Sequence, residues 1–246
     1  MKPPTDEERM VLAAAGELAD GEVCFVGIGL PSLVAILAKR THTPRLTLVY
    51  ESGAADTIPP APPLSTGSPA IVEDATYIGD CLGTFGALQA GHFQVGILSG
   101  AQIDRRGNLN STVIGAYATP KLRMPGSGGA HDIASLVGRL LIVMPHEPRR
   151  FVEKVDFVTT PGHPRHGEPA LAGGGPAAVI TPRGRFVFED GEMTLAALQP
   201  GFTAGQAVEG FGWAPPARSG LGRLPEADPG ALELLRDLTA RGPAAS

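Results

Sequence analysis

Apolar residues along this chain recur first with a helical period and then in short continuous runs. From Val11 to Leu18 they lie on one helical face, and this segment follows Thr5–Glu8, a capping-box sequence. Gly21 is a typical residue at the end of such a helix. The run Val23–Val26 then predicts a buried strand, because strands covered on both faces are continuously apolar.

A second helix and a second strand complete a strand–helix–strand unit. Pro31 suits the first turn of a helix, and the apolar segment Leu33–Leu37 continues it. The run Arg45–Tyr50 predicts the next strand, and Glu51-Ser52-Gly53 follows at its carboxyl end. This succession is typical of a parallel sheet. Ligands bind beyond the carboxyl ends of such strands, so Glu51 lies where a site is expected.

The rest of the chain alternates short apolar runs with helical patterns. We expect strands at Val95–Leu98, Leu140–Met144 and Phe157–Thr160, a hairpin of Val179–Thr181 with Phe186–Phe188 around Pro182–Arg185, and helices at Thr203–Val208 and Ala231–Arg241. The predicted fold class is therefore α/β, with an open, mixed and mostly parallel sheet flanked by helices.

Glycine and proline are numerous, at 33 and 24 residues, but they are not periodic, which argues against collagen-like and repeat architectures. They cluster at Ile58–Pro69, Gly162–Pro176 and Trp213–Gly230, which we interpret as loops or linkers. A chain of 246 residues is long enough for a sizeable core. We expect residues 1–246 to form a single domain with a loop-rich carboxyl-terminal tail from about residue 214.

Composition narrows the class of protein. With 43% hydrophobic and 18% charged residues the chain is globular rather than disordered, and its net charge of -5 without a basic patch argues against nucleic acid as a partner. The first eight residues are polar and acidic, unlike a signal peptide, and no apolar run reaches the roughly 18 residues of a membrane span. Cys24 and Cys81 lie in apolar stretches and are expected to be buried free thiols. We therefore expect a cytoplasmic protein that binds neither nucleic acid nor membrane.

Glu51 is the first candidate for chemistry. A glutamate at a strand end is commonly a solvated surface residue. Here, however, the preceding Leu46–Tyr50 are mostly apolar, and Gly53 leaves room for a ligand to approach the backbone. A carboxylate in a partly desolvated pocket is a better nucleophile, because burial disfavours its charged form. Position alone leaves both the solvated and the functional interpretation open.

Two further segments are rich in turn residues. Gly126–Asp132 begins as a glycine-rich turn and leads into a helical pattern, and the backbone N–H groups of such turns bind anions, although a flexible turn explains the same composition. Gly100–Thr112 contains Asp, Gly and Asn at spacings typical of a tight turn held by bonds from side chains to backbone. We interpret this second segment as structural.

Other kinds of site are poorly supported. His163 and His166 are separated by Pro164 and lack further metal-ligand partners, and His146-Glu147 follows a strand, so we expect no metal site. The chain has no Gly-x-Ser-x-Gly sequence. Gly27-x-Gly29 lacks the third glycine of the dinucleotide fingerprint.

Nine short sequences occur in a specific order along the chain: Val26–Pro31, Glu51–Gly53, Gly100–Asp104, Gly107–Thr112, Pro120–Arg123, Gly126–Ala130, His146-Glu147, Phe151–Asp156 and Pro161-Gly162. As an ordered set they resemble the β subunits of family I CoA-transferases, and most closely the glutaconate and 3-oxoadipate CoA-transferase branch. The resemblance covers roughly residues 8–213.

The resemblance implies a fold, a site and a substrate. It implies an open α/β subunit with the site between two subunits, and a glutamate nucleophile, which is Glu51 here. It places the glycine-rich turn near the reacting thioester, so Gly126, Gly128 and Gly129 are expected to offer backbone N–H groups as an oxyanion hole. Coenzyme A is expected as a substrate rather than a permanently bound cofactor, and no metal is expected.

The resemblance also implies a partner and a reaction. We expect an α subunit in a hetero-oligomer, and substrates that are an acyl-CoA and a free carboxylic acid, dicarboxylic or 3-oxo in type. CoA would be moved through a glutamyl-CoA thioester with ping-pong kinetics. Weaker substrate-binding candidates are Ser52, Lys121 and Arg123, and a hydrogen bond from Ser52 is also suited to orienting Glu51.

Alternatives remain open. The unusually proline-rich stretch from Ala54 to Ser65 departs from the family pattern and bears on the acyl substrate. Acyl-CoA hydrolysis or carbon–carbon bond hydrolysis on the same scaffold is the second hypothesis, because water can attack a glutamyl thioester. A non-catalytic binding subunit is the third.

Overall fold

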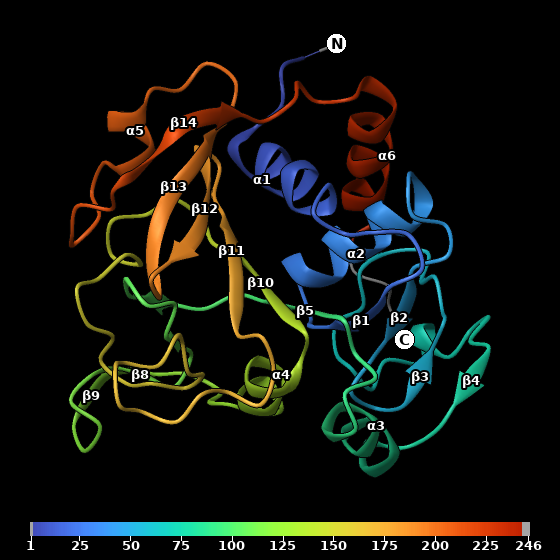
Figure 1. Cartoon of the computed structure of the whole chain (residues 1–246). Helices are drawn as coiled ribbons and strands as arrows, with labels where there is room; N and C mark the ends of the chain where they lie inside the picture. Colours follow the sequence, from blue (N-terminus) through green and yellow to red (C-terminus); the bar gives the residue numbers. More distant parts are fainter. Residues whose placement is uncertain (1, 243–246) are drawn as a thin grey trace.

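A ten-stranded sheet runs through the computed structural model, which describes residues 2–242 (Figure 1). Its strands are β1 (Val23–Val26), β2 (Thr47–Val49), β3 (Ala54–Ala55), β4 (Tyr77–Ile78), β5 (Val95–Leu98), β10 (Arg139–Val143), β11 (Pro176–Ile180), β12 (Gly184–Glu189), β13 (Glu192–Leu198) and β14 (Ala217–Arg223). They lie in the order β14-β13-β12-β11-β10-β5-β1-β2-β3-β4. Five neighbouring pairs are parallel and four are antiparallel, so the predicted mixed, mostly parallel sheet is confirmed.

Helices cover both faces of this sheet. They are α1 (Asp6–Ala15), α2 (Leu30–Arg40), α3 (Cys81–Gln89), α4 (Ala130–Leu136), α5 (Ala204–Val208) and α6 (Pro229–Ala240), with a 3-10 turn at Pro69–Ile71. Residues of α1, α2 and α6 share one hydrophobic cluster with the sheet, and residues of α3, α4 and α5 share a second cluster on the other face. Two small sheets pair β6 (Gln102–Ile103) with β7 (Leu109–Asn110), and β8 (Val113–Gly115) with β9 (Pro120–Arg123). Within residues 2–242 no helix has the length and apolar character needed to cross a membrane.

The parallel centre of the sheet follows the apolar runs of the sequence. β1 pairs in parallel with both β2 and β5, and β10 pairs in parallel with β5. All four residues of β5 and four of the five in β10 are buried. Continuous burial is possible because helices cover both faces, and it explains why these strands are apolar along nearly their whole length.

The first helix begins as its sequence predicts. The hydroxyl of Thr5 accepts a hydrogen bond from the Glu8 backbone N–H at 3.2 Å, and the Glu8 carboxylate accepts one from the Thr5 backbone N–H at 2.7 Å. This reciprocal pair satisfies two amides that have no partner inside the helix. Met10, Val11, Ala14 and Ala15 then face the core.

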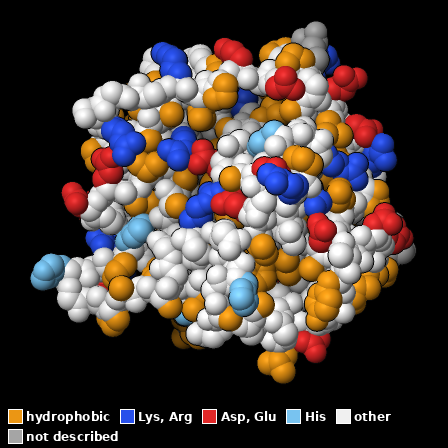
Figure 2. Space-filling view, turned by 45° about the vertical axis from the view of Figure 1, so that its right-hand side comes forward, with side chains coloured by type: hydrophobic (Ala, Val, Ile, Leu, Met, Phe, Trp, Pro, Cys, Tyr) orange, Lys and Arg blue, Asp and Glu red, His pale blue; other side chains and the backbone are white. Residues whose placement is uncertain are grey.

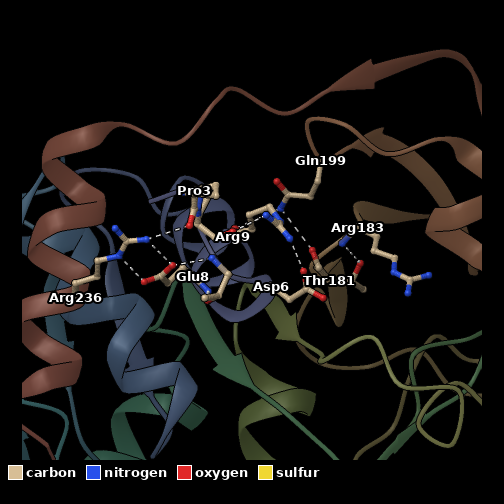
Figure 3. Close-up of polar contacts among 10 residues, drawn as sticks. Pro3, Asp6, Glu8, Arg9, Thr181, Arg183, Gln199 and Arg236 are labelled. Atoms are coloured by element: carbon tan, nitrogen blue, oxygen red, sulfur yellow. Dashed lines mark hydrogen bonds and ion pairs between the residues drawn. The ribbon is translucent and has the colours of Figure 1, made fainter. Parts of the chain in front are cut away.

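The carboxyl-terminal helix is held against the first one. Leu232, Leu235 and Leu238 of α6 are buried. Arg236 of α6 forms an ion pair with Glu8 of α1 at 2.7 Å, and Figure 3 shows the two side chains reaching toward each other. The Arg236 guanidinium holds the pKa of Glu8 at about 2, well below its usual range.

Three expectations drawn from the sequence are corrected. Phe157–Thr160 is not a strand: Thr160 forms only an isolated bridge with Leu109, and Pro161 follows, which donates no backbone hydrogen bond. Trp213–Gly230 is not all loop, because β14 lies within it and pairs in parallel with β13. β14 is largely exposed and has no apolar run, so its pairing with the β13 backbone, rather than its own pattern, defines it. The second predicted strand is also shorter than its apolar run, since β2 contains only three residues.

Cys81 is exposed rather than buried, whereas Cys24 is buried as predicted. Cys81 opens α3, and the apolar residues beside it do not all face the core: Leu82 is 83% exposed. The hairpin of β11 and β12 is confirmed, with Val179 opposite Phe186 in an antiparallel register.

Candidate functional site

Glu51 lies in a tight turn at the carboxyl end of β2, beside the carboxyl ends of β1 and β5. The backbone N–H of Gly53 donates to Tyr50 O at 2.9 Å, and the N–H of Tyr50 donates to Ala54 O at 2.9 Å. These two bonds close the turn around Glu51-Ser52. The structure therefore places Glu51 just beyond a buried parallel strand, as the sequence predicts.

Gly53 allows the chain to pass very close to a neighbouring segment. Its φ is +109°, a conformation that residues with a side chain rarely adopt. A Cβ atom on Gly53 would collide with the backbone of Gly79 and Asp80. The N–H of Gly79 donates to Gly53 O at 3.0 Å. The turn that carries Glu51 is thus fixed against the segment between β4 and α3.

The glycine-rich turn at residues 126–129 meets Glu51. A Cβ atom on Gly129 would lie 3.4 Å from the carboxyl carbon of Glu51 and 2.5 Å from the Phe85 ring. The Phe85 ring belongs to α3 and lies 5.7 Å, centroid to centroid, from the Phe25 ring of β1. Glu51 after β2, Phe85 on α3 and Gly129 before α4 are far apart in the sequence and therefore meet in the folded chain.

Only some of the backbone amides in this turn donate a hydrogen bond. The N–H of Gly126 donates to Ser111 O at 3.0 Å, and the N–H of Ala130 donates to Ser127 O at 2.9 Å. The amides of Gly128 and Gly129 donate to no group within residues 2–242. Gly126 and Gly128 both have positive φ, at +94° and +48°, and a Cβ on either would meet open space.

The Glu51 carboxylate has no polar partner in the described part of the chain. The residue is half-buried, and neither a hydrogen bond nor an ion pair involves its side chain. Ser52, expected to orient Glu51, does not bond it: the Ser52 hydroxyl oxygen is buried and has no partner within residues 2–242. A half-buried carboxylate without a counter-ion is chemically available to a ligand.

Lys121 and Arg123 lie on β9, which leads into the glycine-rich turn through Met124 and Pro125. Both side chains are exposed. The Arg123 guanidinium donates to Tyr117 O at 2.8 Å and stands 4.7 Å from the centre of the Tyr117 ring. Arg123 is therefore engaged within its own hairpin, and the Lys121 ammonium has no partner among residues 2–242.

The tight turn predicted within Gly100–Thr112 is present. Asp104 accepts hydrogen bonds from the backbone amides of Arg106 and Asn108, at 2.9 and 3.1 Å, and from the Asn108 side chain at 2.9 Å. These bonds close the turn between β6 and β7.

His146 has a structural environment. His146 Nε2 lies 2.9 Å from Glu209 O, and its ring packs near Phe151 and Phe211. Burial lowers the pKa of His146. Within residues 2–242 no cluster of three or more His, Cys, Asp or Glu side chains has the arrangement of a metal site.

A cavity of about 610 Å³ opens elsewhere, between α1 and the segment 224–228, and neither Glu51 nor the glycine-rich turn lines it. Arg9 and Gln199 face one another there, and the Arg9 guanidinium is already bonded to Pro4 O at 2.6 Å and to Asp6 (Figure 3). The half-buried Glu51 carboxylate therefore lies outside this cavity.

Phe85 lies beside the turn at Gly129, and the sequence did not indicate this position. It lies in a helix with weak amphipathic character, between two glycines, and no motif contains it. The Phe85 ring packs against Gly129, which is 44 positions away, and no local pattern indicates such a contact.

Comparison with known proteins agrees with these motifs. A family model described as coenzyme A transferase matches residues 7–210. The B subunit of 3-oxoadipate CoA-transferase from Pseudomonas knackmussii is 41% identical, over 100% of this chain and 97% of that protein. The B subunit of glutaconate CoA-transferase from Acidaminococcus fermentans is 33% identical, over 95% of this chain and 91% of that protein.

A solved structure gives the same result for the fold. The crystal structure of glutaconate CoA-transferase from Acidaminococcus fermentans aligns with a TM-score of 0.85 and 34% identity, covering 95% of this chain and 94% of that one.

Proposed function

This chain belongs to the coenzyme A transferase family, and from that premise we propose that it is the β subunit of a two-subunit enzyme in which Glu51 is the nucleophile. The observation that carries the proposal is the contact between the Glu51 carboxyl carbon and the glycine-rich turn at Gly129. A nucleophile and a set of unused backbone N–H donors lie side by side, which is the arrangement that acyl transfer requires.

The first half-reaction begins at the thioester. The Glu51 carboxylate attacks the carbonyl carbon of the acyl-CoA, and the amides of Gly128 and Gly129 donate to the oxyanion that forms. Collapse expels CoA thiolate and leaves a mixed anhydride between Glu51 and the acyl group. The thiolate then attacks the Glu51 carbonyl, so the donor leaves as a free carboxylate and a glutamyl-CoA thioester remains.

The second half-reaction runs the same steps in reverse. The acceptor carboxylate attacks the glutamyl thioester, CoA thiolate leaves, and it then attacks the acceptor's carbonyl in the new anhydride. Acyl-CoA is released and the Glu51 carboxylate is restored. Because the first product leaves before the acceptor reacts, the kinetics are ping-pong. The chemistry uses coenzyme A as a substrate and requires neither a metal nor a resident cofactor.

The acid substrate is proposed to be a dicarboxylic or 3-oxo acid. Two relatives carry the names 3-oxoadipate and glutaconate CoA-transferase, and the first is 41% identical over the whole chain. The unpaired Lys121 ammonium lies on β9, shortly before the glycine-rich turn, and is suited to a second carboxylate. The Arg123 guanidinium is less suited, since Tyr117 already engages it.

The partner is proposed to be an α subunit that covers the open face around Glu51. The large hydrophobic side chains left exposed within residues 2–242 all fall in the loops, short strands and helix start between β3 and β11: Ile58, Leu64, Val72, Tyr77, Ile78, Leu82, Tyr117, Leu122 and Val158. Figure 2, where β4 and α3 come forward, shows hydrophobic side chains gathered on the lower part of this face. Such a concentration favours an interface. A covering subunit would exclude water from the anhydride.

The enzyme is proposed to work in the cytoplasm. Both cysteines are free thiols, and Cys81 is exposed, which suits a reducing compartment.

Trapping of the intermediate tests the mechanism. The complex of both subunits is incubated with succinyl-CoA or glutaryl-CoA and then with borohydride or hydroxylamine, and the peptide that contains Glu51 is examined by mass spectrometry. A mass change there, absent in Glu51→Gln, supports the glutamyl thioester. Glu233→Gln is the control, because Glu233 is exposed on α6, whose helix layer lies on the other face of the sheet from α3 and α4. Consumption of acyl-CoA without an acid acceptor would favour a hydrolase, and if the Glu51 peptide is also unchanged, Glu51 acts as a general base rather than as a nucleophile.

A further inference from the structure

The glycine-rich turn is not held by its own residues alone. Its first residue, Gly126, is bonded twice to Ser111: the Gly126 N–H donates to Ser111 O at 3.0 Å, and the Ser111 hydroxyl donates to Gly126 O at 2.9 Å. The segment before it is bonded to the next residue along, because the Met124 N–H donates to Thr112 O at 2.9 Å. The dipeptide Ser111-Thr112 therefore sets where the turn begins.

One buried side chain holds this dipeptide. The hydroxyl of Thr159 accepts a hydrogen bond from the Ser111 N–H at 2.9 Å and lies 2.7 Å from the Thr112 hydroxyl. Thr159 is only 4% exposed, so water does not replace these bonds when they are lost. Its own backbone is fixed, because the Thr159 N–H donates to Leu109 O at 2.8 Å.

Thr159 also approaches the far end of the turn. His131 follows the turn on α4, and its Nδ1 lies 3.3 Å from Thr159 O. The His131 N–H donates to the Ser127 hydroxyl at 3.1 Å, which folds the turn back on itself. Contacts from Thr159 thus reach both sides of the glycine residues, while Gly128 and Gly129 have no side chains to hold themselves in place.

We infer that Thr159 is a positioning residue for the CoA-transfer reaction, acting through Ser111 and Thr112 to set the distance between Glu51 and the amides of Gly128 and Gly129. This inference rests on the proposed function, in which the amides of Gly128 and Gly129 stabilise the oxyanion. Thr159 does not touch the reacting atoms. Its effect is on the rate of bond formation at Glu51 rather than on substrate affinity, because displacing a preorganised donor weakens the stabilisation of the transition state.

The adjacent residue provides a matched control. Thr160 is 1% exposed, and its hydroxyl is buried without a hydrogen-bond partner among residues 2–242. Thr160→Val therefore makes the same substitution in the same segment without breaking a bond.

A second control lies in another part of the sheet. Thr181 is fully buried, and its hydroxyl accepts from the backbone N–H of Gly184 at 3.1 Å, in the β11–β12 turn near Arg183 (Figure 3). Three strands, β1, β5 and β10, separate β11 from the strand that precedes Glu51. The same hydroxyl also bonds the Arg183 N–H and Gly184 O, so Thr181→Val loses buried hydroxyl bonds away from Glu51.

The test compares these variants in the purified two-subunit complex, with succinyl-CoA as donor and 3-oxoadipate or glutaconate as acceptor. For Thr159→Val we expect kcat, and the single-turnover rate of adduct formation at Glu51, to fall about 10–100-fold, with KM for acyl-CoA within about three-fold of the parent. Thr159→Ser keeps the hydroxyl and is expected to restore the rate to within about three-fold. Thr160→Val and Thr181→Val are expected to keep kcat, whatever their melting temperatures.

If Thr159→Val does not fold, Ser111→Ala tests the next link of the same path, because it keeps the bond from the Ser111 N–H to Thr159 and removes only the bond to Gly126 O; a fall in kcat of about three-fold or more is expected. A folded Thr159→Val or Ser111→Ala complex with unchanged kcat overturns the inference. So does a fall of equal size in Thr181→Val. Glu51→Gln separates the two proposals: if it abolishes adduct formation while Thr159→Val does not affect it, the positioning role fails and the proposed function stands. Full transfer activity in Glu51→Gln removes both.

Discussion

The carboxyl carbon of Glu51 lies 3.4 Å from the position that a Cβ atom on Gly129 would occupy. The absence of a side chain at residue 129 therefore allows the backbone of the glycine-rich turn to lie close to this carboxylate. The Phe85 ring closes the other side, at 2.5 Å from the same position. There is no free volume for a methyl group at this position.

Gly129→Ala tests this relationship. The added methyl group must displace the Phe85 ring or the Glu51 carboxylate, so we expect kcat to fall by about 100-fold or more, as it does when an oxyanion donor is lost. The measurement is steady-state transfer in the two-subunit complex, with stability recorded by thermal unfolding.

Gly205→Ala in α5 is the control for Gly129→Ala, because a Cβ there meets nothing within 4 Å. This control is expected to leave kcat unchanged and to stabilise the chain by about 0.5–1 kcal/mol. An active Gly129→Ala enzyme would show that the turn is not packed against Glu51 during turnover.

Gly53→Ala is expected to be strongly destabilising. The substitution combines a φ of +109° with a collision against the backbone of Gly79 and Asp80, which cannot move away as a flexible side chain can. We expect a loss of about 3 kcal/mol or more in the free energy of unfolding, measured with a chemical denaturant.

Gly21→Ala separates conformational strain from collision. Gly21 also has a positive φ, +87°, but a Cβ there meets open space. Only the strain is left, so a loss of about 1 kcal/mol is expected. Equal losses at both positions would mean that the contact between Gly53 and the Gly79 backbone does not constrain the turn.

The ion pair between Glu8 and Arg236 predicts a pH dependence. The folded chain lowers the pKa of Glu8 from 4.5 to about 2, so the contribution to stability is complete above about pH 4.5 and is lost as the pH falls toward 2. Glu8→Gln keeps the capping-box bond but loses the charge. Its melting temperature is expected to lie a few degrees below that of the parent at pH 7, with the difference shrinking below pH 4.5.

Glu7→Gln is the control for Glu8→Gln, because Glu7 is exposed in the same helical turn and has no ion pair among residues 2–242. A difference between the Glu8 variant and the parent that persists unchanged at pH 3 would contradict the assignment of the low pKa to Glu8.

The reactivities of the two cysteine thiols test where the partner subunit binds. Cys81 is exposed at the start of α3, next to Leu82, whereas Cys24 is fully buried and burial raises its pKa. A maleimide is expected to modify Cys81 quickly in the isolated chain and Cys24 only after unfolding. In the two-subunit complex we expect Cys81 to react at least about ten-fold more slowly, if the partner covers the hydrophobic face as obligate interfaces do.

Equal reactivity of Cys81 in the free chain and in the complex would exclude α3 from the interface. Modification followed by liquid chromatography and mass spectrometry of the two cysteine peptides gives both rates in one experiment.

Local sequence determined much of the fold. The capping box at Thr5–Glu8 and the apolar runs Val23–Val26 and Val95–Leu98 predict elements that the structure confirms. Each of these signals is short-range: a helix start satisfies its own amides, and a strand covered on both faces is apolar throughout. The ordered motifs also identified the coenzyme A transferase family, which the comparisons confirm.

Other features of the fold depend on tertiary contacts that no local sequence pattern encodes. Phe157–Thr160 is apolar enough for a strand, yet only Thr160 finds a bridging partner, and the exposed β14 forms because β13 offers its backbone. Likewise, Phe85 and Thr159 belong to no motif, and they contact Gly129 and Ser111 across long stretches of chain.

The sequence alone places Glu51 at the end of a buried strand. It also predicts a glycine-rich turn at residues 126–129, just before a helix. Both predictions are possible because the pattern of apolar residues and the conformational freedom of glycine act over a few residues. Only the folded chain decided that these two segments meet, with the Phe85 ring behind them and Thr159 holding the turn. The reason is that packing and buried hydrogen bonds depend on which distant segments are brought into contact, and a single sequence carries no local signal for that choice.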